Sequence, residues 1–136
     1  MISAWVCALA LLLQAPPAAP SPAMLADFEA RLQREPDNLR LGADYRQAII
    51  PGKQFDRAIK FFRDLVKKNP RAQNAHINYA FAYIDKIPEA SGFSQPFIGR
   101  DAINTFTKAL QLGPSWLALY VRDLMNTQIR LLLHFL

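Results

Sequence analysis

Side chains that could take part in catalysis or bind a metal are few in this chain of 136 residues, and they lie far apart. His76 and His134 are the only two histidines and Cys7 is the only cysteine, so none has a second nitrogen or sulfur ligand of the zinc type nearby. Asp85 and Glu89 flank a loop, but their spacing does not assign them the roles of general acid and base. No phosphate-binding glycine loop and no Gly-x-Ser-x-Gly motif occurs. We expect no enzyme, no cofactor and no metal; a hydrolase is the alternative, for which no residue can be named.

The charges of the chain do not form a site either. The formal net charge is +5, from 16 lysines and arginines and 11 aspartates and glutamates. The basic residues are scattered over polar helix faces, apart from Lys67 and Lys68 near a predicted helix end, where cations suit the helix dipole. The interleaved basic and aromatic residues of a nucleic-acid-binding module are absent. We therefore expect no nucleic-acid partner, and a nucleic-acid surface is the alternative.

One pattern of apolar residues occurs three times and predicts three amphipathic helices. Each copy has an aliphatic residue, a phenylalanine three residues later, a second aliphatic residue four later, and a proline four later again. The apolar positions share one face of an α-helix. The proline ends the helix because it lacks an N–H and disfavours the helical conformation of the residue before it. The copies are Leu25, Phe28, Leu32 and Pro36; Ile59, Phe62, Val66 and Pro70; and Ile103, Phe106, Leu110 and Pro114.

The helices that carry this pattern are expected at residues 22–34, 55–68 and 100–112. Between and after them, further helices are predicted at residues 39–50, 72–87 and about 116–133. Ser21, Asn38 and Ser115 are the candidate N-caps. No alternating run of apolar and polar residues and no Asn-Gly hairpin signal occurs, so the predicted fold class is all-α.

The spacing and residue types resemble those of the tetratricopeptide-repeat (TPR) family. Pro36 and Pro70 lie 34 residues apart, which is the period of that family's helix-turn-helix unit. The family's pattern of large, small and aromatic residues matches Tyr45, Ile49, Ala58 and Phe62 in the first unit, and Tyr79, Ala80, Tyr83, Ala102, Phe106 and Ala109 in the second. The resemblance implies a right-handed superhelical stack of antiparallel helix pairs, an α-solenoid with two full repeats at about 39–72 and 73–116 and flanking half-repeats.

The chain departs from the family pattern at several positions. Gly42 and His76 stand where the family often has tryptophan, and Arg46 and Leu65 stand where it prefers small residues. The second unit carries ten extra residues, which predict an insertion loop at about 86–99. We expect Phe93 and Phe97 of this loop to pack against the end of the helix pair. In the alternative, the loop adds a wall to a concave surface.

The resemblance also implies the kind of function. TPR proteins are scaffolds that bind a peptide or a segment of another protein in a concave groove lined by the first helix of each pair. The carboxylate clamp of chaperone-binding members is incomplete here, so the partner is an unidentified protein or peptide. The groove-lining candidates on this chain are Arg40, Arg46, Gln47, Asn74, Asn78 and Tyr79.

Residues 1–23 resemble a secretory signal peptide that precedes a helical domain at 24–136. The apolar run from Ala4 to Leu13 is too short for a membrane-spanning helix and is followed by small residues, with expected cleavage after Ala23. The expected location is exported, periplasmic or secreted, as for a short bacterial-type TPR protein. An uncleaved membrane anchor and a wrongly assigned start are the alternatives.

The C-terminal segment is apolar where the last helix of a stack should be polar. Trp116, Leu117, Tyr120, Leu124 and Ile129 give its helix a loose apolar face. Either the sequence is a truncated reading of a longer array, or this tail docks on another chain. The alternative function is therefore a structural or membrane-associated assembly subunit. Membrane contact is expected only through residues 1–23 or this tail.

Overall fold

The computed structural model describes residues 18–134, and it confirms an all-α fold for them. Within that range the chain forms helices and turns and no strand. The apolar run of the predicted leader lies outside the described residues. The helices are α2 (Pro22–Arg34), α3 (Leu39–Ile49), the 3-10 helix η2 (Ile50–Gly52), α4 (Phe55–Lys68), α5 (Gln73–Lys86), the 3-10 helix η3 (Ile87–Glu89), α6 (Gln95–Leu112) and α7 (Trp116–His134).

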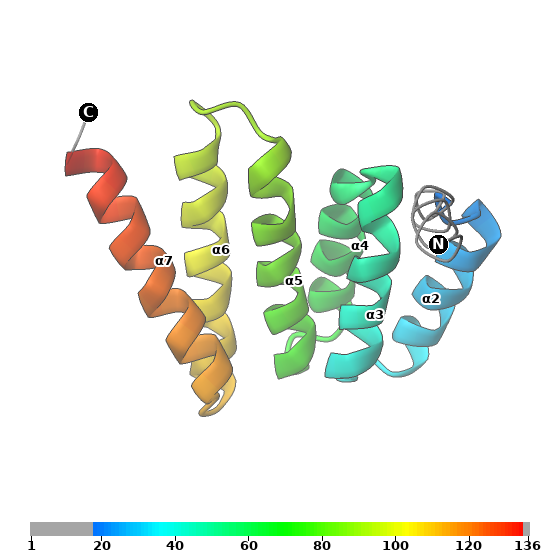
Figure 1. Cartoon of the computed structure of the whole chain (residues 1–136). Helices are drawn as coiled ribbons and strands as arrows, with labels where there is room; N and C mark the ends of the chain where they lie inside the picture. The colour runs from blue at the N-terminus through cyan, green and yellow to red at the C-terminus, as the bar shows by residue number, and fades with distance from the viewer. Residues whose placement is uncertain (1–17, 135–136) are drawn as a thin grey trace, which may run out of the picture.

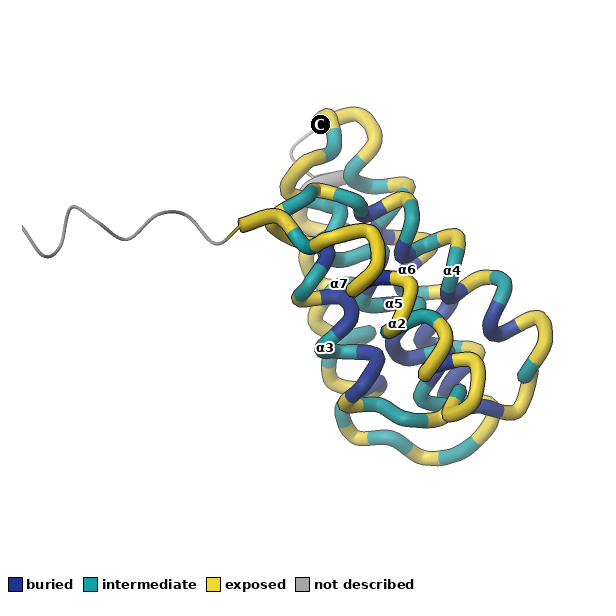
Figure 2. The backbone as a smooth tube through the Cα atoms, turned by 90° about the vertical axis from the view of Figure 1, so that its right-hand side faces the viewer, coloured by how far each residue is buried: buried dark blue, intermediate teal, exposed yellow. Residues whose placement is uncertain are grey.

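The α-helices stand side by side in a row that begins with α2 and ends with α7 (Figure 1). Short connections make successive helices antiparallel, and each packs against its neighbours in sequence. Helices that are not consecutive also meet, because α3 packs against α5 and α2 contacts α4. The buried residues lie where the helices face one another, and the exposed ones lie on the outside (Figure 2).

The predicted caps form at three helix starts. Ser21 Oγ accepts a hydrogen bond from the Met24 amide at 3.1 Å, and Asn38 Oδ1 accepts one from the Leu41 amide at 2.9 Å. Ser115 Oγ accepts from the Ala118 amide at 3.3 Å at the start of α7. These side chains satisfy amides that have no partner within the first turn of a helix. The bounds of α2 and α4 agree with the predicted ranges 22–34 and 55–68.

The predicted loop at 86–99 is wrong in its second half, because α6 begins at Gln95 and not at residue 100. Pro96 belongs to the segment that was predicted as a loop from its composition. It lies instead in the first turn of α6, where a missing N–H costs no helical hydrogen bond. The predicted packing of the loop aromatics is also wrong, since Phe93 is 92% exposed and Phe97 is 66% exposed.

The core consists of two clusters along the row of helices. The first joins α2, α3 and α4 with one side of α5 and includes Leu25, Tyr45 and Phe62. The second joins α5, α6 and α7 around Phe106. Small residues such as Ala80 and Ala109 are buried in the second cluster and let the helix backbones approach closely. Of the three repeated phenylalanines, Phe62 and Phe106 are fully buried, and Phe28 is half-buried against the first cluster.

A polar network fastens α2 to the next two helices. The Glu29 carboxylate of α2 accepts hydrogen bonds from the Tyr45 hydroxyl of α3 and from Arg57 of α4, whose Nε lies 2.7 Å away. Burial alone would raise the pKa of Glu29, but the hydrogen bonds from Arg57 and Tyr45 outweigh burial and hold this pKa below its usual value. Burial and the bond to Glu29 raise the pKa of Tyr45, which keeps the hydroxyl protonated as a donor.

We expect Glu29→Gln to lower the free energy of unfolding at pH 7 by about 1–3 kcal/mol, because two partners lose a charged acceptor. A carboxyl whose folded-state pKa is lowered stabilises the fold above its unfolded-state pKa, and this contribution is lost as the pH falls through the folded-state pKa. The difference between the variant and the parent should therefore begin to shrink below the ordinary carboxyl pKa of 4.5 and should vanish only below the lower pKa of the folded state. Urea denaturation at pH 7 and at pH 3 tests this. Glu89→Gln, at an exposed pair with Lys53, is the control and should change little.

Candidate partner-binding surface

Two of the six predicted groove residues, Arg46 and Asn78, meet in the interior between α3 and α5. Arg46 Nε donates to Asn78 Oδ1 at 3.3 Å, and Arg46 Nη1 lies 2.6 Å from Asp85 Oδ2. The guanidinium also lies over the Phe81 ring, 4.8 Å from its centroid. Asn78 is only 1% exposed and Arg46 is 9% exposed. Both side chains hold α3 against α5, and neither is free to contact a partner while these helices stay packed.

Gly42 makes room for this contact. Asn78 Nδ2 donates to the Leu39 carbonyl at 3.2 Å, and the Asn78 side chain lies against the backbone of α3 at Gly42. A Cβ at Gly42 would lie 2.1 Å from Asn78 Nδ2, which no side chain could tolerate without a shift. Residue 42 is glycine where the resembled family often has tryptophan, and the Asn78 amide fills part of the space that a larger side chain would take.

The other four predicted residues do not form one surface. Arg40 is exposed and pairs with Asp44 at 3.0 Å. Gln47 is also exposed, farther along α3. Asn74 binds the connection between α2 and α3 through its side chain, which donates to the Asp37 carbonyl at 2.9 Å. Arg40 and Gln47 are accessible to a partner, and their role in binding stays a prediction.

Tyr79, the last of the six, lies elsewhere. It is half-buried, and its hydroxyl is 2.8 Å from that of Tyr83 one turn along α5. Burial and the bond to Tyr83 raise the pKa of Tyr79, and its charged neighbours are Arg63 of α4 and Asp101 of α6. Tyr79 therefore faces the side of α5 that packs toward α4 and α6, away from the contact of Arg46 with Asn78.

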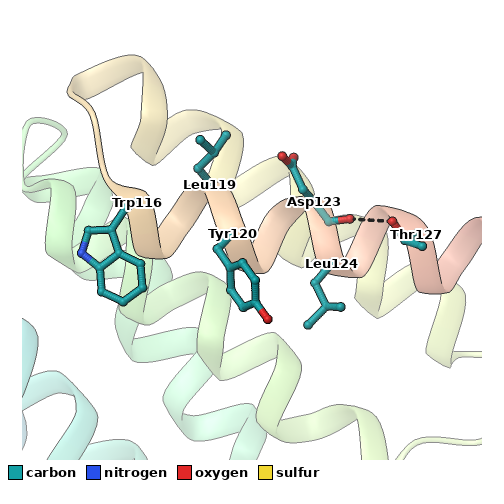
Figure 3. A pocket seen from close by; sticks show the side chains of 6 residues that line it. All are labelled: Trp116, Leu119, Tyr120, Asp123, Leu124 and Thr127. Carbon is teal, nitrogen blue, oxygen red and sulfur yellow. Dashed lines mark hydrogen bonds between the residues drawn. The ribbon is translucent and has the colours of Figure 1, made fainter.

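The most exposed apolar surface outside the α5–α6 turn is on α7. Trp116, Tyr120 and Leu124 are 80%, 63% and 47% exposed and lie one helical turn apart. Figure 3 shows them projecting from the same side of the helix, with Leu119 and Asp123 beside them. Together with Thr127, these six residues line an open groove of about 490 Å³. We call this surface the α7 face.

The opposite side of α7 holds the helix to the stack. Ala118 is buried, and Leu117, Val121 and Met125 pack against the second core cluster. Ile129 lies close to Gly99 of α6, where a Cβ would be 2.9 Å from Ile129 Cδ1. The single loose apolar face predicted for this helix is thus two faces, and Leu117 and Ile129 belong to the buried one. The spacing in the sequence could have separated the two faces, because Trp116, Tyr120 and Leu124 are each four residues apart and so share one side of the helix.

Two polar residues of the α7 face, Asp123 and Thr127, are already engaged. The Asp123 carboxylate accepts from Arg122 at 2.8 Å, and Thr127 Oγ1 donates to the Asp123 carbonyl at 3.0 Å. The face therefore offers apolar area with one carboxylate at its edge. It suits the burial of apolar side chains of a partner, because a contiguous exposed apolar patch typically marks an interaction site.

A second hollow of about 150 Å³ lies where the end of α2 meets α4, lined by Gln33, Phe61, Asp64, Leu65 and Lys68. It is smaller than the pockets of about 300–1,000 Å³ that bind small molecules. Among residues 18–134, no three His, Cys, Asp or Glu side chains are grouped so as to hold a metal ion. In the same range no helix combines the length and the apolar character needed to cross a membrane.

Comparison with known proteins gives no match for this chain, neither to a protein-family model, nor to a curated protein, nor to a solved structure.

Proposed function

We propose that this chain is a protein–protein interaction module of the TPR type and that the α7 face binds a helical segment of another polypeptide. The observation that carries the proposal is the exposure of Trp116, Tyr120 and Leu124 along one side of a helix whose other side is packed. The 34-residue spacing supports the solenoid, since it agrees with the adjacent antiparallel pairs α3 with α4 and α5 with α6.

A helix fits the α7 face better than an extended strand or a small molecule. The exposed side chains recur every three or four residues, which forms the ridges that a second helix packs into. From residue 116 to 127 the face is about 16 Å long at 1.5 Å per residue, or three helical turns. Trp116 and Tyr120 of this face are large aromatic residues, the type that dominates binding energy at interfaces. Binding by an amphipathic helix in an apolar groove is a common mode of recognition.

Trp116 provides the assay for this proposal. The chain contains two tryptophans, so Trp5→Phe in the full chain leaves Trp116 as the only one. The probe is a synthetic peptide with the sequence of α4, an amphipathic helix of 14 residues, and a scrambled version serves as the negative control. We expect saturable binding with a blue shift of the Trp116 emission, because the indole leaves water. Tyr120→Arg should weaken binding at least tenfold, which is about 1.4 kcal/mol.

The matched control is Phe97→Arg, which places the same charge at another exposed aromatic position, on α6. Its affinity for the peptide should equal that of the parent. If the peptide leaves the emission unchanged, or if Tyr120→Arg binds as tightly as Phe97→Arg, the α7 face is not a helix-binding surface.

A further inference from the structure

The α7 face occupies positions that are buried on α3. Pro36 precedes α3 and Pro114 precedes α7. Residues that stand six, nine, ten and thirteen places after these prolines have equivalent positions on the two helices. On α3 they are buried, and on α7 they are exposed. The residues are Gly42, Tyr45, Arg46 and Ile49 on α3, and Tyr120, Asp123, Leu124 and Thr127 on α7. On α5 the equivalent Ala80 is buried, and His76, Tyr79 and Tyr83 are half-buried.

On α3 the second of these, Tyr45, packs against Phe62 of the following helix α4. Gly42 and Arg46 face α5 instead. The α7 face is therefore the side on which the next helices of such a stack would pack.

The other end of the row exposes the complementary half. Pro36, Pro70 and Pro114 follow α2, α4 and α6. Residues that stand twelve, eight and five places before these prolines have equivalent positions on the three helices. They are Ala58, Phe62 and Leu65 on α4 and Ala102, Phe106 and Ala109 on α6, all of them buried. On α2 they are Met24, Phe28 and Arg31, of which Met24 is 46% exposed, Phe28 is half-buried and Arg31 is exposed. We call these three residues the α2 flank.

We infer that the α7 face of one molecule binds the α2 flank of a second copy, so that the copies join end to end. This inference rests on the proposed function and names its partner. Within one chain the two surfaces lie at opposite ends of the row and do not meet (Figure 1). Between two copies, α7 and α2 would form one more antiparallel pair of the kind that α3 and α4 form. The junction would then continue the packing that already runs through the stack.

The packing of Tyr45 on Phe62 sets the expected register, with ring centroids 5.8 Å apart. By the counting above, Asp123 has the position of Tyr45 and Phe28 has that of Phe62. The transferred register therefore places Phe28 of the second copy over Asp123, with Tyr120 and Leu124 on either side. Arg31 then lies opposite Tyr120, where a guanidinium can stack on the ring, and near the Asp123 carboxylate. Asp123 is the acidic residue of the α7 face and Arg31 is the basic residue of the α2 flank, so their charges are opposite. Arg31 would share the Asp123 carboxylate with Arg122, which already donates to it. Within its own chain, Arg31 lies 3.9 Å from Asp27 with both side chains exposed, and its guanidinium lies 5.9 Å from the centroid of the Phe28 ring.

Such a contact joins two different surfaces and leaves one of each free, so it does not close on itself in pairs. The mass of the wild-type full chain should therefore rise with concentration past that of a dimer. A single helix pair buries less than the roughly 1,200 Å² of stable complexes, so we expect association at about 100 µM and monomers at about 1 µM. Sedimentation velocity over this range measures it.

Two variants that each block one end make the test specific. Tyr120→Arg blocks the α7 face, and Met24→Arg blocks the α2 flank; both residues are exposed, so circular dichroism should show unchanged folding. Each variant alone should remain monomeric at 100 µM. Their equimolar mixture should form a one-to-one dimer, because one intact α7 face meets one intact α2 flank. Phe97→Arg should associate as the wild type does.

Three outcomes would overturn the inference: a monomeric wild type at 100 µM, a Met24→Arg variant that still self-associates, or a mixture that stays monomeric. Self-association through residues 1–23 would persist in both blocked variants and so is distinguished. If the α4 peptide binds the α7 face while the wild type stays monomeric, only the second copy as partner is rejected. If the peptide also fails to bind, the proposed function itself is rejected.

Discussion

Replacing Phe106 by alanine is expected to lower the free energy of unfolding by about 3–5 kcal/mol, which is a large part of the total stability of a domain of this size. Phe106 is fully buried, and its ring meets the Phe81 ring edge-on with centroids 5.2 Å apart. Ala80 and Ala109 are small residues of the same cluster. Their side chains end at Cβ, so they cannot rotate to fill the cavity. Chemical denaturation of the full chain measures the loss.

The matched control is Phe97→Ala in the same helix. Phe97 is 66% exposed, so its removal should change the unfolding free energy by no more than about 0.5 kcal/mol. Equal losses for the two variants would contradict the packing of α6 described here, since they would mean that the side of the helix that carries Phe106 is no more buried than the side that carries Phe97.

Asp85→Ala is expected to lower the free energy of unfolding by a similar amount, roughly 3–5 kcal/mol, for a different reason. It leaves the Arg46 guanidinium buried between α3 and α5 without the carboxylate that lies 2.6 Å away. Taking a charge out of water is unfavourable, and without the carboxylate no opposite charge offsets this loss of hydration. Asp44→Ala removes the partner of the exposed Arg40 and should cost less than about 1 kcal/mol.

A double substitution separates the burial of the charge from the loss of packing. Arg46→Met removes the charge and keeps much of the side-chain volume. The double variant Arg46→Met, Asp85→Ala should therefore be more stable than Asp85→Ala alone. If the double variant is less stable than Asp85→Ala alone, Arg46 stabilises the fold through its contacts with Phe81 and Asn78 more than its uncompensated charge destabilises it.

The sequence was sufficient for features that depend on neighbouring residues. Ser21, Pro22 and Pro36 act within one helical turn, and they set both ends of α2 as predicted. The repeated stripe likewise predicted Phe62 and Phe106 as core residues, because helical spacing alone places them on the inner face. Pro96 shows the limit of such local reasoning. Proline is compatible with a loop and with the first turn of a helix, and the neighbours did not decide between them.

The site residues depended on contacts that spacing does not reveal. Arg46 was assigned to an open groove by family resemblance, yet its partners Asn78 and Asp85 are 32 and 39 residues away in sequence. Their meeting also requires the space left by Gly42. The exposure of Tyr120 was likewise hidden, since an apolar residue at helical spacing predicts a buried face. Only the arrangement of α6 and α7 determines which of the two apolar sides of α7 is covered.

The packing of each helix mainly on its sequence neighbours affects how the fold comes apart. α7 is held along one side, chiefly by α6, whereas α5 has helices on both sides. The free energy that keeps α7 in place is then a local quantity, and most of the first core cluster does not contribute to it. Fraying of the C-terminal helix can therefore occur while α2, α3 and α4 stay folded, and the molecule passes through partly unfolded forms of different length.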